Sequence, residues 1–495
     1  MERWNLFAMK RLRTLTAFLA ATAILSVGGC ANTTAPQSNG DNAESDKLTL
    51  YWMSESRPKN ISYFNRLLEE KGYDFQVEFL CVENTDNNYE FVETAQEYRE
   101  KQTPVDILEP GYVWIENYRR PYLEFTKGGM YLPLNDYLNT EDGKKVWDVC
   151  EERVWDRLNI DGSYYAIPKN HLYARPSAIV YRSDLAEQYS IDPQVFQKDI
   201  SEWEPALRTI QQKVQAKGFY AMECPYDFST FLGRYNYTEP YELGVGIVAD
   251  ESTDVREVIN FYETEAAEHL WSTVRSYIDK GYMPETCHEQ NTRYFSFSSL
   301  LMTDSQAQEN ASDFGGGTWK SEIYTGDIYM NGANEANVLG IASWSAHPEE
   351  TFELITAVMT DAELSNALVW GELETDYIEM NGRRYLTNGG YPPDFGANYM
   401  LIEPMPTEPV EKKELYPQLM KRAITPKTAD FHFDGTAVKD EIDAVSKVYN
   451  DLGSKGIFLQ TLDEVNQQMK NAGIDRIIDE YNRQLAQWDQ EQAQK

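Results

Sequence analysis

Apolar residues near the beginning of the chain follow two different periods, which predict strands and a helix. Residues 48–52 form an apolar run typical of a buried strand, and residues 75–79 alternate between apolar and polar positions. Between them, residues 64–68 place apolar side chains at helical spacing. The chain is therefore expected to open with a strand, a helix and a second strand.

Strand and helix patterns continue to alternate further along the chain. Val105–Leu108, Tyr164–Pro168 and Ala178–Tyr181 are strand-like, whereas Trp203–Val214 and Trp271–Tyr282 have helical periodicity. Strands that alternate with helices favour parallel sheets with helices on both faces. These patterns predict an α/β fold.

The C-terminal part of the chain carries helical signals. Thr461–Glu464 fits a capping box, Gly473 interrupts the periodic pattern, and Thr360–Glu363 fits a capping box at an earlier helix start. After Gly473 one helix face collects apolar side chains, and we expect this face to pack on the body of the protein rather than on a partner. The face consists of Ile474, Ile477, Ile478, Tyr481, Leu485 and Trp488.

The N-terminal segment has the pattern of a signal peptide. A basic region precedes an apolar stretch over residues 15–27, which is too short to span a bilayer as a mature helix. The stretch ends in Leu25–Cys30, which resembles the bacterial lipobox. This resemblance implies removal of residues 1–29 and a thioether-linked diacylglycerol on Cys30, which would hold the protein on the outer face of the cell membrane. An ordinary secretory signal with an incidental Cys30 is the alternative.

Composition and net charge indicate which segments are flexible and which classes of binding partner are excluded. Residues 30–46 are rich in Asn, Thr, Ser, Pro and Gly and are expected to form a flexible leash. Removal of residues 1–29 takes away four basic residues and Glu2, so that the formal charge moves from −35 to −38. This charge argues against nucleic acid or an anionic surface as a partner. The length of 495 residues with 42% apolar residues predicts two or three domains.

The remaining cysteines are scattered along the chain as Cys81, Cys150, Cys224 and Cys287. They form no CxxC pair and have no histidine at ligand spacing, so the sequence predicts neither a zinc site nor any other metal or cofactor. Outside the cytoplasm four cysteines allow three disulfide pairings, and four free buried thiols are the alternative.

Several further segments occur in a characteristic order. The earlier ones are Tyr51–Trp52, Pro104–Ile107, Gly128–Leu138, Gly162–Pro168 and Ile179–Leu185, and the later ones are Gly340–Ser343, His347–Glu349, Phe431–Asp434, Val438–Ile442 and Ala472–Ile478. Together with the lipobox and the leash, they resemble the extracellular solute-binding proteins of ABC importers, the class that includes maltose-binding protein. The later segments resemble its long Gram-positive branch, which carries a C-terminal domain of uncharacterised function. The resemblance is loosest over Asn236–Asn337.

This resemblance implies a two-lobed, periplasmic-binding-protein-like fold of type II with a cleft between the lobes. Residues 47–168 and about 290–341 are expected to form lobe 1, and residues 169–289 and about 342–429 lobe 2. Residues 430–495 are expected to form a helical region packed on lobe 2. The implied function is capture of a small polar solute, predicted to be a carbohydrate, by lobe closure, followed by delivery to an ABC permease in the membrane.

A sugar presents hydroxyl groups on its edge and C–H bonds on its faces, so its receptor needs aromatic rings and planar polar side chains. The 33 Tyr and 11 Trp residues of the chain meet this need, although most large aromatic side chains in proteins are core residues. The resemblance narrows the choice to residues of loops and crossovers that would face the cleft. These are Ser54, Glu55, Arg57, Tyr112, Trp114, Tyr173, Arg175, Tyr226, Asp227 and Trp319.

Two other classes of function are alternatives. A surface glycoside hydrolase needs a carboxylate pair, which 80 acidic residues always allow, but the chain has no GxSxG, HExxH or P-loop motif. Its five histidines are scattered and are expected to be surface or capping residues. We therefore expect no enzymatic activity. A sensor or structural surface lipoprotein built on the same fold would have the same sequence features.

Overall fold

The structure is a computed structural model of the chain, and its first described residue is Lys47. The predicted signal peptide, Cys30 and the predicted leash lie outside the described residues. The structure describes residues 47–82, 90–110, 121–174, 176–225, 231–237, 246–286, 293–312, 314–330, 338–390, 392 and 398–494.

The first sheet is built around β1 (Leu48–Ser54). Within the described residues it has five strands in the order β2-β1-β3-β12-β4. β1 pairs in parallel with β2 (Phe75–Cys81) and β3 (Ile107–Glu109), whereas β12 (Val338–Ile341) runs antiparallel between β3 and β4 (Ile167–Pro168). The strand–helix–strand opening predicted from the sequence is confirmed.

Helices pack on this sheet through their apolar faces. α2 (Ile61–Glu70), α12 (Pro348–Thr360) and α13 (Ala362–Trp370) share one core cluster with β1 and β12. The side chain of Asp361, rather than Thr360, accepts the backbone N–H groups that cap α13, so the predicted capping box lies one residue too early. Further helices on this side are α3 (Glu90–Glu100), α4 (Pro121–Lys127), α5 (Asn135–Leu138), α6 (Glu141–Trp147), α7 (Glu152–Asp156) and α14 (Lys412–Arg422).

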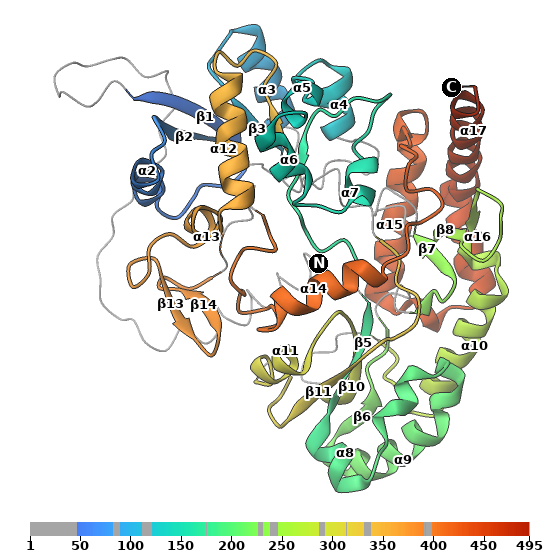
Figure 1. Cartoon of the computed structure of the whole chain (residues 1–495). Helices are drawn as coiled ribbons and strands as arrows, with labels where there is room; N and C mark the ends of the chain where they lie inside the picture. The colour runs from blue at the N-terminus through green and yellow to red at the C-terminus, as the bar shows by residue number, and fades with distance from the viewer. Residues whose placement is uncertain are drawn as a thin grey trace, which may run out of the picture. The chain divides into compact units, whose positions relative to one another are not determined.

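The second sheet is built around β5 (Ser177–Arg182). Its order in the described residues is β11-β5-β10-β6. β5 runs antiparallel to β10 (Arg293–Leu300) and β11 (Trp319–Ile323), and β10 runs parallel to β6 (Phe219–Met222). Figure 1 shows these strands side by side. The second sheet is therefore mixed, as is the first sheet with its antiparallel β12, so the prediction of parallel sheets holds only for β2-β1-β3 and for the β10–β6 pair.

The C-terminal helices belong to the core of the second sheet. α15 (Lys439–Lys455), α16 (Leu462–Ala472) and α17 (Ile474–Gln492) contribute to one buried cluster with β5 and β6. In α17 the buried residues include Tyr481 and Leu485 from the predicted apolar face, so the packing of this face on the body is confirmed. Other helices of this part are α8 (Ser183–Tyr189), α9 (Glu204–Val214), α10 (Glu265–Asp279) and α11 (Asp304–Glu309).

Shorter elements complete the described chain. Strands β7 (Tyr235–Tyr237), β8 (Ile247–Asp250) and β9 (Val258–Asn260) form a small antiparallel sheet, and β13 (Tyr377–Met380) pairs with β14 (Arg383–Leu386) in a hairpin. Single-turn 3-10 helices occur at Pro193–Gln197, Ile200–Trp203, Gln215–Lys217, Phe261–Glu263, Gly435–Val438 and Ile457–Leu459.

We call the part packed on the first sheet the first lobe and the part packed on the second sheet the second lobe. The expected division of the later chain between them is wrong for two segments. β10 and β11, expected in lobe 1, pair with β5 in the second sheet. α12 and α13, expected in lobe 2, pack with β1 in the first lobe. The cause is that consecutive strands of the later chain join different sheets: β10 and β11 the second, and β12 the first. Local periodicity predicts a strand but not the sheet that it joins.

Parts of two connections between the sheets lie in the described residues, which do not include Arg175 and residues 331–337. Residues 169–176 lead from β4 to β5, and Leu172, Tyr173 and Ala174 within them lie in the core of the first lobe. The chain after β11 returns toward β12, and the Met330 backbone N–H donates to the Ile424 carbonyl, 2.9 Å away. This second connection is thus bonded to the segment that follows α14.

Candidate ligand-binding site

Half of the ligand-binding residues predicted from the sequence have no described position. Tyr112, Trp114, Arg175, Tyr226 and Asp227 lie outside the described residues. Their role stays a prediction. The described part of the site lies at the strand ends of the first sheet and in the crossover after β4.

The carboxyl ends of β1, β2 and β3 meet at one edge of the first sheet. Ser54, the last residue of β1, is in register with Cys81 of β2 and Glu109 of β3. In open α/β sheets this edge is the usual ligand position. Ser54 is buried and its hydroxyl accepts the Ser56 backbone N–H at 3.3 Å. The structure thus places Ser54 at the carboxyl edge of the sheet, as the last residue of β1, and its contact with a ligand stays a prediction.

Glu55 and Arg57 follow Ser54 directly beyond the strand. Glu55 is half-buried and its carbonyl accepts the Cys81 thiol, with 3.4 Å between sulfur and oxygen. Arg57 is exposed. Both residues therefore lie next to the carboxyl edge, and their contact with a ligand stays a prediction.

A buried ion pair lies at the same edge, and the sequence reasoning missed it. The Lys169 Nζ is 2.6 Å from Glu109 Oε1, and the two side chains are 3% and 0% exposed. The Trp52 indole N–H donates to the second carboxylate oxygen of Glu109 at 2.7 Å. The available signal was a charged residue that ends an apolar strand and directly precedes Pro110. Glu109 and Lys169 join the end of β3 to the start of the crossover.

The crossover itself bends sharply at its second residue. Asn170 has a φ of 50°, in the left-handed region that non-glycine residues adopt rarely. Its side-chain amide donates to Asn398 Oδ1 at 3.0 Å, and the Tyr399 backbone N–H donates to the Lys169 carbonyl at 3.2 Å. The His171 ring then stacks on the Tyr399 ring, with centroids 4.1 Å apart. Left-handed residues of this kind cluster at functional sites.

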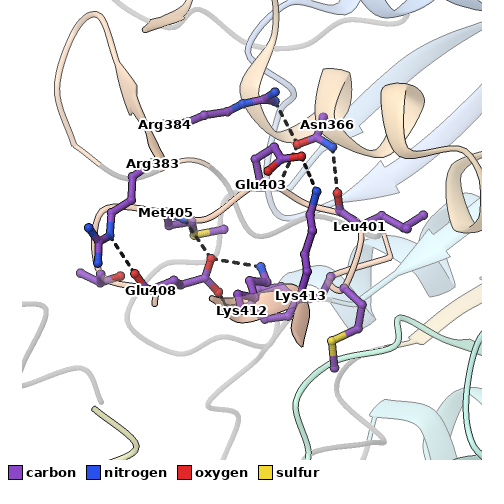
Figure 2. A network of polar contacts seen from close by, with 12 residues as sticks. Asn366, Arg383, Arg384, Leu401, Glu403, Met405, Glu408, Lys412 and Lys413 are labelled. Carbon is purple, nitrogen blue, oxygen red and sulfur yellow. Dashed lines mark hydrogen bonds and ion pairs between the residues drawn. The ribbon is translucent and has the colours of Figure 1, made fainter. Parts of the chain in front are cut away.

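A second buried ion pair supports Tyr399 from its other side. The Lys412 ammonium lies 3.6 Å from the centroid of the Tyr399 ring and donates to Glu408, whose carboxylate also accepts the Tyr399 hydroxyl. Burial lowers the pKa of Lys412, while the Glu408 charge opposes this shift. Figure 2 shows the Glu408–Lys412 pair of this network, where the backbone N–H of Met405 also points to Glu408 and the Arg383 side chain reaches the Glu408 carbonyl.

Two of the predicted aromatic residues are core residues. Tyr173 is 1% exposed in the first-lobe core, and desolvation raises the pKa of its hydroxyl. Trp319 is 2% exposed, and its indole N–H donates to the Gly316 carbonyl at 3.0 Å. Neither side chain is exposed in this structure, and their contact with a ligand stays a prediction. Tyr173 was also expected on the second lobe and lies in the first.

The described cysteines are free thiols. Cys81, Cys150 and Cys224 form no disulfide within the described residues, and Cys287 lies outside them. Cys150 is buried, and desolvation raises the pKa of its thiol. A grouping of acidic, histidine or cysteine side chains fit to hold a metal ion is absent from the part of the chain that the structure describes. In that part, no helix has both the length and the hydropathy needed to cross a bilayer.

Comparison with known proteins identifies this arrangement of sheets. The N-glycan transport solute-binding protein NgtS from Streptococcus pneumoniae matches with a TM-score of 0.65 and 17% identity over 90% of this chain and 99% of NgtS. An extracellular solute-binding protein from Bifidobacterium longum subsp. infantis matches with a TM-score of 0.56 and 12% identity over 88% and 97% of the two chains. The chain has the two-lobed α/β fold of solute-binding proteins. The fold predicted from the sequence is confirmed.

Sequence comparison also finds a relative that aligns with nearly the whole chain. A protein of Streptococcus pneumoniae serotype 4 (strain ATCC BAA-334 / TIGR4), described as a carbohydrate ABC transporter substrate-binding protein, is 21% identical over 525 residues, which cover 98% of each chain. Residues 427–490 match the family described as "Domain of unknown function (DUF3502)". This match coincides with the C-terminal helices that complete the core of the second lobe.

Proposed function

We infer that this chain is the extracytoplasmic receptor of a carbohydrate ABC importer. It captures an oligosaccharide between its lobes, carries out no chemistry on it, and delivers it to a membrane permease. The observation that carries this proposal is the end-to-end match to the substrate-binding protein of a carbohydrate ABC transporter, which spans 98% of both chains. If the two proteins shared only one domain, such as a catalytic domain, part of at least one chain would remain unaligned.

The geometry of the first lobe supports a binding role. Ser54, Cys81 and Glu109 end adjacent strands at one edge, where solute-binding folds of the open α/β type take their ligands. The Glu109 charge is neutralised by Lys169 at 2.6 Å, so Glu109 itself is not an isolated carboxylate suited to acid or base catalysis. A buried and electrically balanced ion pair behind this edge is compatible with capture of a neutral sugar.

Lipid anchoring is part of the same proposal. The Leu25–Cys30 segment has the lipobox pattern, and the residues up to 46 have the composition of a leash. Two acyl chains on Cys30 would keep the receptor at the outer face of the membrane, close to its permease. Replacement of Cys30 by Ala is expected to release the protein into the medium, which fractionation of cells carrying either form would reveal.

The experiment that tests the binding function is a thermal-shift screen of the protein from Lys47 onward. Because a ligand that binds only the folded state raises the melting temperature by mass action, a saccharide ligand gives a concentration-dependent rise. Man1GlcNAc and Man5GlcNAc belong in the screen because structures of NgtS are described in complex with them. Amino acids and peptides serve as controls. A shift with a peptide and with no sugar would refute the carbohydrate assignment.

A further inference from the structure

The crossover after β4 is held at its first residues by contacts that come from three separate parts of the chain. Glu109 ends β3, Lys169 follows β4, and β12 lies between these two strands in the sheet. The ion pair therefore spans β12 and joins residues that are 60 positions apart in the sequence. Asn398 and Tyr399 approach the same crossover from the segment after the β13–β14 hairpin.

Stability alone does not explain an ion pair in this place. A fully buried pair often contributes no more to stability than apolar side chains of equal volume, because both charges lose their hydration. What such a pair provides is a defined geometry, since Glu109 must meet both Lys169 Nζ at 2.6 Å and Trp52 Nε1 at 2.7 Å. Both donors constrain the carboxylate, and the carboxylate constrains the start of the crossover.

The left-handed turn at Asn170 provides an independent observation of the same constraint. Asparagine tolerates this conformation better than most residues because its side chain can bond locally. Here the side-chain amide bonds instead to Asn398, whose own amide donates to the Met359 carbonyl at 2.9 Å in α12. Two hydrogen bonds thus connect the bend at Asn170 to α12 of the first lobe. The next residue, His171, is held by stacking on the Tyr399 ring.

We propose that Glu109, Lys169 and Asn170, held by Asn398 and Tyr399, form a crossover anchor whose residues position the sugar-binding elements rather than touch the sugar. The anchor sets the direction in which the chain leaves β4. It also fixes the distance between the start of the crossover and the end of β3. Both segments lead into stretches for which the sequence predicts ligand contacts. The effect on affinity rests on the proposed function, whereas the effect on the crossover does not.

The first test replaces the ion pair in a way that keeps the core neutral. Glu109→Gln combined with Lys169→Met removes both charges, retains an acceptor for the Trp52 N–H and fills the space of the lysine stem. We expect a melting temperature close to that of the native protein, a dissociation constant for Man5GlcNAc raised about tenfold, and faster hydrogen exchange in residues 170–174. Exchange in α12 serves as the internal control.

The two readouts separate the anchor from the proposed function. If the native protein binds neither Man5GlcNAc nor any other saccharide of the screen, the proposed function fails, and the exchange of residues 170–174 still decides on the anchor. If the double variant shows native hydrogen exchange in residues 170–174, or binds a saccharide with native affinity, the ion pair only fills space in the core. Either result would overturn the anchor.

A second pair of variants covers the case in which the double variant does not fold. Both variants lose the hydrogen bond to Asn398, but Asn170→Gly keeps the left-handed conformation whereas Asn170→Ala opposes it. The alanine variant should therefore raise the dissociation constant about tenfold and accelerate exchange in the crossover, and the glycine variant should do so to a smaller extent. The matched control is Asn381→Ala, because Asn381 also has a positive φ, 54°, but lies in the exposed turn of the β13–β14 hairpin. Equal behaviour of the Asn170 and Asn381 alanine variants contradicts the anchor.

Discussion

At the scale of single residues, Tyr131 is a buried polar group whose removal should stabilise the protein. Its ring is 2% exposed and packs edge-on against Phe125, but its hydroxyl has no hydrogen-bond partner among the described residues. An unpaired buried hydroxyl opposes folding, so Tyr131→Phe should raise the free energy of unfolding by about 1 kcal/mol. The matched control is Tyr122→Phe, which removes a 2.5 Å hydrogen bond to the Leu158 carbonyl and should lower it by a similar amount. Urea unfolding measures both changes, and equal signs would contradict this reading.

The same residue predicts a pH dependence. Desolvation holds the pKa of Tyr131 well above its ordinary value of 10.0. Above that value the unfolded chain loses the phenolic proton while the folded chain keeps it, so stability is full below pH 10 and falls as the pH rises further. The advantage of Tyr131→Phe should therefore grow above this pH. An advantage that stays constant would show that Tyr131 titrates normally in the fold.

Residue roles were only partly predictable from the sequence. Ser54, Glu55 and Arg57 lie at the carboxyl end of β1 because a strand pattern also locates its own end. Tyr173 and Trp319 became core residues because an aromatic side chain suits a core as well as a sugar. Glu109 and Lys169 were missed because each charge alone suggests a solvated position. Only the strand order, with β12 between β3 and β4, brings them together.

At the scale of elements, α14 begins at the second buried ion pair. Glu411 provides no side-chain cap and Pro417 lies inside the helix, so its own sequence opposes helix formation. The Glu408–Lys412 pair, whose side chains are 6% and 0% exposed, compensates at the first turn. Glu408→Gln alone leaves the lysine charge buried and should cost about 3 kcal/mol of unfolding free energy, whereas adding Lys412→Met should restore most of it. Chemical unfolding of both variants tests this, and an equal loss in the double variant would assign the stabilisation to the charge attraction itself.

Elements with local signals were predictable, and their pairing was not. Gly473 ends α16 in the left-handed conformation, with a φ of 107°, and the Thr461 capping box begins that helix, as the sequence indicated. β10 and β11 were assigned to the wrong sheet because an exchange between sheets is a long-range pairing. Gly340 shows what long-range packing requires, since a Cβ there would lie 2.0 Å from the Tyr131 ring.

At the scale of the whole molecule, the C-terminal region is part of the second lobe and not an appendage. Its helices supply buried residues to the same cluster as β5 and β6, including Val445, Ile477 and Tyr481. Each fully buried side chain of this kind stabilises the fold by about 2 kcal/mol. In contrast, the large core cluster of the first lobe contains no residue beyond Ala423. The two lobes therefore depend on the end of the chain to different degrees.

Deletion of residues 430–495 should accordingly unfold the second lobe and leave the first lobe folded. The loss of several buried side chains exceeds the free energy of about 5–15 kcal/mol that holds an ordinary domain together. We expect binding of a hydrophobic dye, protease cleavage confined to residues 177–323, and loss of saccharide binding, because capture requires both lobes. Deletion of residues 493–495, which follow α17, is the control and should change none of these. A shortened chain with native melting temperature and protease resistance would show instead that residues 430–495 are dispensable for the fold, and their function would then have to be sought in contacts with another molecule.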